Sequence, residues 1–282
     1  MSEAIRRVRL HDGSTVPSLG QGTWRMGSNR NARKTELESL RLGIELGMTL
    51  IDTAEMYGDG ASEELVGEAI DGQREKIFLV SKVMPANASR TGVRRSCHAS
   101  LKRLGTDRID LYLLHWRGAI SLAETIDGFE ALRRDGMIGD WGVSNFDVDD
   151  MQSLVGTARP GGCLVNQVLY NLEARGIEFD LLRYSHDQGV PLMAYSPVGQ
   201  GGALLDHPVL AIIGRDHGKT PAQIALAWTL LHPNVISIPK AASPAHVREN
   251  AEAASIQLKA ADLAALDRAF PPPTQKTSLE ML

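Results

Sequence analysis

Short apolar runs rich in β-branched residues alternate along the chain with longer stretches in which apolar residues recur every three or four positions. Nearly continuous apolar runs are typical of parallel strands covered on both faces, and the longer period is typical of amphipathic helices. The pattern therefore predicts eight parallel strands separated by helices. The predicted strands are Ser18–Gly20, Thr49–Asp52, Ile77–Lys82, Ile109–His115, Gly139–Ser144, Leu164–Gln167, Pro191–Tyr195 and Val235–Pro239.

Capping residues mark the expected ends of several helices. Thr35 and Ser121 are each followed three positions later by a glutamate, which is the spacing of a capping box. Thr220 precedes Pro221, and proline is favoured at the first helical position. Glycine is favoured just beyond the last turn of a helix. The glycines at which helices are expected to stop are Gly47, Gly105, Gly136 and Gly189.

The alternation is compatible with an open doubly wound sheet or with a closed barrel. A dinucleotide-binding sheet usually carries G-x-G-x-x-G after its first strand, but Gly20–Arg25 reads GQGTWR and lacks the third glycine. Length, strand count and this missing motif favour one (β/α)8 TIM barrel domain over residues 1–282. Arg6–His11 and Ser14–Pro17 predict an N-terminal β-hairpin at its bottom, and Pro271–Pro273 should end the last helix before a short C-terminal tail.

Composition narrows the class of partner. The formal net charge is −4, which gives no basic excess to neutralise nucleic acid. Apolar runs fall short of the roughly 20 residues that cross a membrane, and Met1–Arg7 has no apolar segment behind its charges, so no secretory signal is expected. Cys97 and Cys163 lack metal-ligand spacing and are expected to be free thiols. These features predict a cytoplasmic protein with a small-molecule partner, no nucleic acid and no membrane.

Polar or aromatic side chains stand at or just after the end of seven consecutive predicted strands. In a (β/α)8 barrel, the carboxyl ends of the strands meet on one face, where active sites form. The regularity of these residues therefore predicts an active site on that face. They are Asp52, Lys82, His115, Ser144, Asn145, Gln167, Tyr195, Ser196 and Lys240.

Four of the residues near the first strand ends form a set suited to acid catalysis: Asp52, Tyr57, Lys82 and His115. A lysine cation stabilises a neighbouring phenolate and should lower the pKa of Tyr57 from about 10. A histidine can donate a hydrogen bond to a carbonyl oxygen, and a tyrosine can protonate that oxygen as hydride arrives. Each residue alone also has a plain structural explanation, such as an ion pair or core packing. Their joint occurrence at neighbouring strand ends favours catalysis.

Six segments of the chain carry a shared pattern of strand ends and loops. They are Leu50–Gly58, Asp110–Trp116, Trp141–Phe146, Asn166–Gln167, Ala194–Pro197 and Ile238–Lys240. In combination they resemble the aldo/keto reductase family. The resemblance extends from Gly20 to Asn250 and is greatest to the small bacterial members described as methylglyoxal reductases. It implies reduction of small aldehydes and ketones, such as methylglyoxal and aromatic aldehydes, with NADPH or, as the alternative cofactor, NADH.

The resemblance also implies roles for individual residues. Tyr57 would be the general acid, Asp52 and Lys82 would tune it, and His115 would orient the carbonyl. Among the cofactor contacts, Ser144, Asn145 and Gln167 would hold the nicotinamide carboxamide and Tyr195 would stack on the ring. The full set implied for cofactor binding is Gly22, Thr23, Trp24, Asp52, Ser144, Asn145, Gln167, Tyr195, Ser196, Pro197, Lys240, His246 and Asn250.

The segment after the last strand is a candidate phosphate site, although an ordinary turn with a solvated lysine is the alternative. Ser243-Pro244 predicts a helix N-terminus, which attracts anions, next to Lys240. The family usually has serine or threonine where this chain has Ala241, and an arginine where it has His246. Histidine loses most of its charge by pH 7, so NADPH should still be preferred but held less tightly.

Aromatic residues just past the strand ends are expected to form an apolar wall for the substrate. The connections around them are short, which predicts an open pocket that accepts small or varied carbonyl compounds. Trp141 and Trp228 are instead expected in the core. The residues expected to line the substrate pocket are Trp24, Tyr57, Met84, His115 and Trp116.

Two other classes of protein use similar residues. A metal-dependent barrel hydrolase needs several ligands together, but the sequence has no H-x-H motif and only His115 stands at a predicted strand end, so no metal site is predicted. A catalytically slow nicotinamide-binding regulatory or sensing subunit is the second alternative. The complete set of Asp52, Tyr57, Lys82 and His115 favours catalysis over sensing. The family resemblance suggests a monomer.

Overall fold

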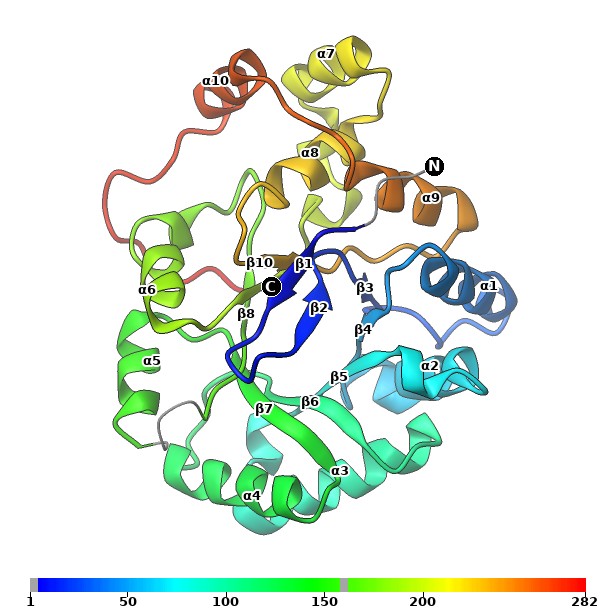
Figure 1. Cartoon of the computed structure of the whole chain (residues 1–282), viewed down its shortest axis with the longest axis vertical. Coiled ribbons are helices and arrows are strands. Elements are labelled where there is room, and N and C mark those ends of the chain that lie inside the picture. Colours follow the sequence, from blue (N-terminus) through cyan, green and yellow to red (C-terminus); the bar gives the residue numbers. More distant parts are fainter. Residues whose placement is uncertain (1–4, 158–161) are drawn as a thin grey trace.

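The computed structural model describes residues 5–157 and 162–282. Residues 1–4, part of the segment on which the expectation of no secretory signal rests, lie outside the described residues. Within these described ranges, eight parallel strands follow one another in chain order around a barrel that the helices surround (Figure 1). They are β3 (Gln21–Gly22), β4 (Leu50–Asp52), β5 (Phe78–Val83), β6 (Ile109–Leu114), β7 (Ile138–Ser144), β8 (Asn166–Leu169), β9 (Leu192–Tyr195) and β10 (Val235–Ser237).

The predicted (β/α)8 barrel is confirmed, with shifted strand ends. Its first strand was placed at Ser18–Gly20, but β3 begins at Gln21, and the residues before it pair with the last strand instead. The Gly20 amide donates to the Ser237 carbonyl at 2.9 Å, and parallel bridges join Leu19 to Ser237 and Gly22 to Lys240. The chain at Ser18–Gly20 therefore closes the barrel before it joins the sheet next to β4.

Ten α-helices lie outside the strands in the described part of the chain (Figure 1). Most follow a strand and return the chain to the bottom of the barrel, as parallel strands require. They are α1 (Arg33–Glu45), α2 (Ala61–Ile70), α3 (Arg90–Leu104), α4 (Leu122–Arg134), α5 (Val148–Val155), α6 (Leu181–Gln188), α7 (Pro208–His217), α8 (Pro221–Thr229), α9 (Pro244–Ala253) and α10 (Ala260–Ala269).

The predicted helix caps have mixed outcomes. Thr220 forms a complete capping box with Gln223, and Ser243 accepts a hydrogen bond from the His246 amide. Ser121 caps α4 through the Glu124 amide, but the Glu124 carboxylate accepts from the Arg90 amide instead of closing the box. Capping glycines were predicted correctly, since all four have positive φ. They are Gly47, Gly105, Gly136 and Gly189.

The capping box predicted at Thr35 is wrong. Helix α1 begins two residues earlier, at Arg33, and Ala32 is its N-cap residue without a side-chain hydrogen bond. The Asn29 carbonyl accepts from the amides of Ala32 and Arg33, so this turn starts the helix before Thr35 is reached. Thr35 is therefore already inside the helix.

The predicted hairpin closes the bottom of the barrel. Strands β1 (Arg7–Arg9) and β2 (Thr15–Pro17) pair antiparallel, and they appear dark blue near the barrel axis in Figure 1. Val8 and Val16 are buried in the same apolar cluster as Leu50, Leu111 and Met193 from the strands. This cluster fills the inside of the barrel below the strand ends.

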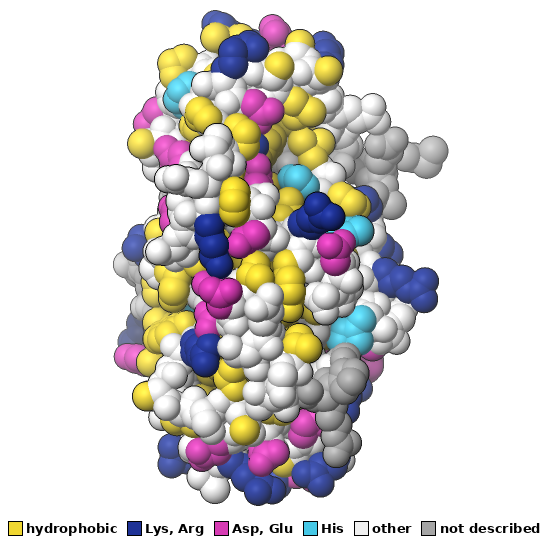
Figure 2. All heavy atoms as spheres, turned by 90° about the vertical axis from the view of Figure 1, so that its left-hand side faces the viewer, with side chains coloured by type: hydrophobic (Ala, Val, Ile, Leu, Met, Phe, Trp, Pro, Cys, Tyr) yellow, Lys and Arg dark blue, Asp and Glu magenta, His cyan; other side chains and the backbone are white. Residues whose placement is uncertain are grey.

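A second, larger core lies between the strands and the helices. It includes Trp141 and Trp228, both predicted to be core residues, at 1% and 4% exposure. Both cysteines are buried free thiols. Positive and negative side chains intermingle with apolar ones over the face shown in Figure 2. Among the described helices, none has the length and apolar character that crossing a membrane requires.

The last helix ends where the proline run predicts. Helix α10 stops at Ala269, just before Phe270 and Pro271, and the tail that follows runs to Leu282 without a regular element. Leu279 packs against the larger core, and the Lys276 ammonium lies 3.4 Å from Asp149 and 3.6 Å from Asp180. The predicted short C-terminal tail is therefore held against the barrel along part of its length.

Candidate active site

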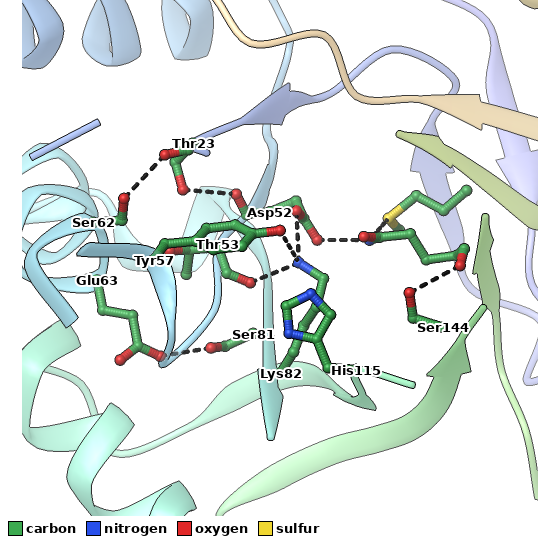
Figure 3. A network of polar contacts seen from close by, with 12 residues as sticks. Thr23, Asp52, Thr53, Tyr57, Ser62, Glu63, Ser81, Lys82, His115 and Ser144 are labelled. Carbon is green, nitrogen blue, oxygen red and sulfur yellow. Dashed lines mark hydrogen bonds and ion pairs between the residues drawn. The ribbon is translucent and has the colours of Figure 1, made fainter. Parts of the chain in front are cut away.

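The ammonium group of Lys82 is the centre of the candidate site (Figure 3). Lys82 is in β5 and fully buried, and its Nζ atom lies 2.8 Å from Asp52 Oδ2 at the end of the neighbouring strand β4. Nζ also donates to the Thr53 carbonyl at 2.9 Å and to Tyr57 Oη at 3.2 Å. These three contacts satisfy the three donors of an ammonium group. The structure thus brings together Asp52, Tyr57 and Lys82, as the strand order predicts.

Burial has the largest effect on the pKa of Tyr57. Its side chain is 9% exposed, and burial is the largest cause that raises its pKa. The Lys82 cation acts in the opposite direction, and Asp52 adds to the increase. The prediction of a lowered pKa for Tyr57 is therefore wrong, although the Lys82 cation does act to lower it, as predicted. Tyr57 keeps its proton at neutral pH and is available as an acid.

Lys82 remains charged in spite of its burial. Burial alone would lower the pKa of its ammonium group, but Asp52 and Tyr57 together raise it above the usual value. A buried cation is stable only when it is paired and hydrogen-bonded, and Asp52 supplies that pairing. The second carboxylate oxygen of Asp52 accepts from Gln167 Nε2 at 2.7 Å, which connects this group to β8.

His115 follows β6 and lies beside Tyr57, with ring centroids 5.8 Å apart. Burial, helped by the Lys82 cation, lowers its pKa to about 2. The imidazole is therefore neutral in the physiological range. Its Nδ1 atom is buried and has no hydrogen-bond partner among the residues that the structure describes.

Tyr57 begins a turn, Tyr57–Gly60, in which three successive residues have positive φ. Gly58 and Gly60 adopt this region at little cost, but Asp59 at φ 52° is strained because it carries a Cβ atom. Asn145 and Ser196, two of the predicted cofactor contacts, also have positive φ, at 60° and 49°. Such strain concentrates where a functional site requires it, and no feature of the sequence predicts it at these two residues.

The predicted carboxamide-binding residues form one hydrogen-bonded group. Asn145 Nδ2 donates to the His115 carbonyl at 3.1 Å and to Ser144 Oγ at 3.2 Å, and its Oδ1 accepts from Tyr195 Oη at 3.0 Å. Ser144 Oγ donates to the Gln167 carbonyl at 2.9 Å. The ends of β6, β7, β8 and β9 are thereby linked on one face.

Other predicted cofactor residues lie near the place where the first and last strands meet and close the barrel. Thr23 is buried and donates to the Asp52 carbonyl at 3.0 Å, and Gly22 bridges to Lys240. Asn250 in α9 shares a small cavity with Gly22. The remaining members differ in exposure: Lys240 and His246 are exposed, Ser196 is half-buried and Pro197 is buried.

Four of the five predicted pocket residues form a continuous aromatic group. The Trp24 and Tyr57 rings meet edge to face at 4.9 Å, and the His115 and Trp116 rings lie 5.0 Å apart. Trp24 is 40% exposed, so this group is open to solvent. The fifth residue, Met84, follows β5.

Glu55 is a further residue of this site that the sequence did not predict. Its Oε1 atom accepts from the Met84 amide at 2.7 Å and from Asn87 Nδ2 at 3.1 Å. These contacts join the loop that carries Tyr57 to the loop that carries Met84. Only the folded chain brings these loops together, so the sequence around Glu55 offered no signal.

The comparisons with known proteins agree with this geometry. The family model described as the aldo/keto reductase family matches residues 18–270. The chain belongs to the aldo/keto reductase family and is an enzyme of that type. It is 52% identical to the methylglyoxal reductase YeaE of Escherichia coli, over 98% of this chain and 99% of that protein. It is 36% identical to a glyoxal reductase of Bacillus subtilis, over 92% of this chain and 91% of that protein.

Solved structures of the family have the same fold. An aldo/keto reductase of Klebsiella pneumoniae, crystallised in complex with NADP and acetate, superposes with a TM-score of 0.95 at 48% identity, covering 98% of this chain and 99% of that one. Another aldo/keto reductase structure from Klebsiella pneumoniae, in complex with NADPH, gives a TM-score of 0.96 at 48% identity, covering 99% and 100%.

Proposed function

We propose that the chain reduces small aldehydes and ketones with NADPH and that Tyr57 is the proton donor. The observation that carries this proposal is the buried contact of Tyr57 Oη with Lys82 Nζ at 3.2 Å, beside a neutral His115. A protonated phenol next to a fixed cation can give up a proton and leave a stabilised phenolate. Membership of a reductase family fits this chemistry.

The residues present fit a nicotinamide cofactor. Ser144, Asn145 and Gln167 offer hydroxyl and amide groups on one face, and the half-buried Tyr195 ring lies beside them. An amide of the cofactor can exchange hydrogen bonds with such groups, and an aromatic ring can stack on a planar one. When bound, the reduced cofactor supplies the hydride.

His115 and Tyr57 would act on the same substrate oxygen. Because a buried donor without a partner is costly, the unpartnered Nδ1 of His115 favours the tautomer with its proton on Nε2. That proton would be donated to the carbonyl oxygen as a hydrogen bond. The carbonyl carbon gains hydride, the oxygen gains the Tyr57 proton, and the product is an alcohol. Lys82 would then stabilise the phenolate, with Asp52 keeping Lys82 charged.

The substrate class follows from the aromatic group formed by Trp24, Tyr57, His115 and Trp116. An open, largely apolar wall suits small 2-oxoaldehydes such as methylglyoxal and also aromatic aldehydes. The Escherichia coli relative is named a methylglyoxal reductase, which supports the first of these classes.

The phosphate end of the cofactor would lie at the start of α9. Ser243 caps this helix, and Lys240 is exposed near its N-terminus. A helix N-terminus with a nearby cation favours the extra phosphate of NADPH. His246 offers less charge than an arginine, so NADPH would be preferred but held less tightly than an arginine would hold it.

The first test follows oxidation of the reduced cofactor by absorbance, with methylglyoxal and a nitrobenzaldehyde and with NADPH and NADH in parallel. Faster oxidation of NADPH is expected with both substrates.

Tyr57→Phe keeps the ring but removes the proton, so it should lose at least about 100-fold in kcat and still bind NADPH. Equal or faster oxidation of NADH would overturn the cofactor preference. A fully active Tyr57→Phe would overturn the role of Tyr57. Cofactor binding without turnover would instead favour a nicotinamide-binding regulatory or sensing subunit.

A further inference from the structure

The first turn of α2 carries a buried carboxylate that the proposed reaction does not use. Glu63 is fully buried, and both of its oxygens are occupied. Oε1 accepts from Ser81 Oγ at 2.6 Å and Oε2 accepts from Arg103 Nε at 2.6 Å. Breaking such a pair leaves an uncompensated buried charge, so Glu63 fixes the positions of Ser81 and Arg103.

Ser81 connects Glu63 to the strand that carries Lys82. Successive side chains of a strand point to opposite faces, so Ser81 faces the helices while Lys82 faces the inside of the barrel. Figure 3 shows the two side chains on opposite sides of β5, with Glu63 and Ser81 away from the Tyr57 ring. A shift of Ser81 along or away from α2 therefore moves Lys82 with it.

Arg103 connects Glu63 to the turn that carries Tyr57. The turn passes into α2 at Gly60, and a Cβ atom at Gly60 would lie 2.4 Å from Arg103 Cδ. The guanidinium stem thus packs directly under the strained turn Tyr57–Gly60. A strained turn persists only where neighbouring groups hold it in place, and Arg103 is one of these groups.

The same helical turn is anchored from the other side. Ser62 is buried and donates to the carbonyls of Thr23 and Met26, at 2.9 and 2.6 Å. Two successive residues of α2 therefore fix this helix end to β5, to α3 and to the loop after β3. The reacting groups Tyr57 and Lys82 lie between these anchors.

We propose that Glu63 is a positioning residue, which together with Ser81 and Arg103 sets the separation between Tyr57 and Lys82. This inference rests on the proposed function of Tyr57. Catalytic groups lose up to about 100-fold in rate when they are displaced by roughly 1 Å. The contact at risk is the 3.2 Å hydrogen bond between Lys82 Nζ and Tyr57 Oη.

The test compares Glu63→Gln and Ser81→Ala with the wild type, using methylglyoxal and NADPH. Glu63→Gln keeps the size of the side chain but removes its charge, so kcat should fall roughly 10-fold while the Kd for NADPH stays within about twofold. The primary isotope effect with deuterated NADPH should rise, because the chemical step becomes slower. Ser81→Ala should lower kcat less, and the double variant should resemble Glu63→Gln alone because the two residues share one contact.

Glu178→Gln is the matched control, since Glu178 forms a similar pair with Arg175 between β8 and α6. It should lower the Tm and leave kcat and the isotope effect unchanged. If Glu63→Gln does not fold, Ser81→Ala and Arg103→Lys carry the test with the same readouts. Unchanged kcat in folded variants would overturn the proposal, and so would equal losses of rate and cofactor affinity.

Failure of this inference can be told from failure of the proposed function. An inactive wild type or a fully active Tyr57→Phe would contradict the proposed function itself. An inactive Tyr57→Phe together with a fully active Glu63→Gln would contradict only the positioning role of Glu63.

Discussion

His115 is neutral because burial and the Lys82 cation both oppose its protonation, which lowers its pKa to about 2. A histidine with the usual pKa of about 6.5 would change the rate in the physiological range. We therefore expect kcat with methylglyoxal at saturating NADPH to show no inflection between pH 5 and 8. The proposed mechanism requires protonated Tyr57, whose pKa is raised, so activity should fall only as the pH rises past the usual tyrosine value of about 10. An acidic limb near pH 6.5 would show that a histidine titrates in the reaction.

Replacing Lys82 should affect both the rate and the stability, and these two effects can be measured separately. Lys82→Met removes the cation that offsets burial at Tyr57, so the pKa of Tyr57 should rise further and kcat should fall about 100-fold or more. It also leaves Asp52 as an unpaired buried carboxylate, which should cost about 3 to 5 kcal/mol in the free energy of unfolding. Adding Asp52→Asn should restore much of that stability, measured by urea unfolding, without restoring kcat. Recovery of both together would assign the loss of rate to misfolding.

At the residue scale, the sequence predicted which groups meet but not their protonation. Asp52, Lys82 and His115 stand at consecutive strand ends, and strand order in a barrel makes them neighbours. The pKa of Tyr57 depends on how completely the folded chain covers the phenol, so its direction was predicted wrongly. Glu63 and Arg103 are 40 positions apart in sequence, and only helix packing brings them together.

Among the elements, strands were predicted better than caps. Each predicted apolar run overlaps or adjoins a strand, because burial on both faces needs a continuous run of apolar residues. A cap depends on where the first turn forms, and a preceding turn at Asn29 moved the start of α1 away from Thr35. A complete capping box therefore forms at Thr220, where Pro221 marks the start of the helix, but not at Thr35.

These two threonines give a matched pair at the scale of the helix. Thr220→Ala removes a complete capping box at α8 and should cost about 1 kcal/mol in the free energy of unfolding. Thr35 is exposed inside α1, where alanine is the better helix former, so Thr35→Ala should be neutral or slightly stabilising. Urea unfolding of both variants measures the difference. An equal loss at the two positions would contradict the helix start at Arg33.

At the scale of the whole molecule, Arg175 joins parts of the chain far apart in sequence. Its guanidinium contacts Glu178 and Asp267, each at 2.8 Å, donates to the Phe270 carbonyl, and lies 5.0 Å from the centre of the Trp228 ring. The segment between β8 and α6 is thereby held against α8 and the end of α10. Arg175 lies outside the group around Lys82, so its effect should be on stability.

Arg175→Met should therefore weaken the fold and spare the chemistry. Removing one partner of a buried ion pair leaves Glu178 with an uncompensated charge, which should cost about 3 kcal/mol or more. For a chain of this size, that loss corresponds to a Tm lower by roughly 6 °C. Arg183→Met is the matched control, because Arg183 is 89% exposed and its contact with Asp187 should contribute less than about 0.5 kcal/mol. Calorimetry measures both Tm values, and kcat at 25 °C should stay at the wild-type level in both variants. A large fall in kcat for Arg175→Met at full folding would show that the end of α10 also shapes the active site.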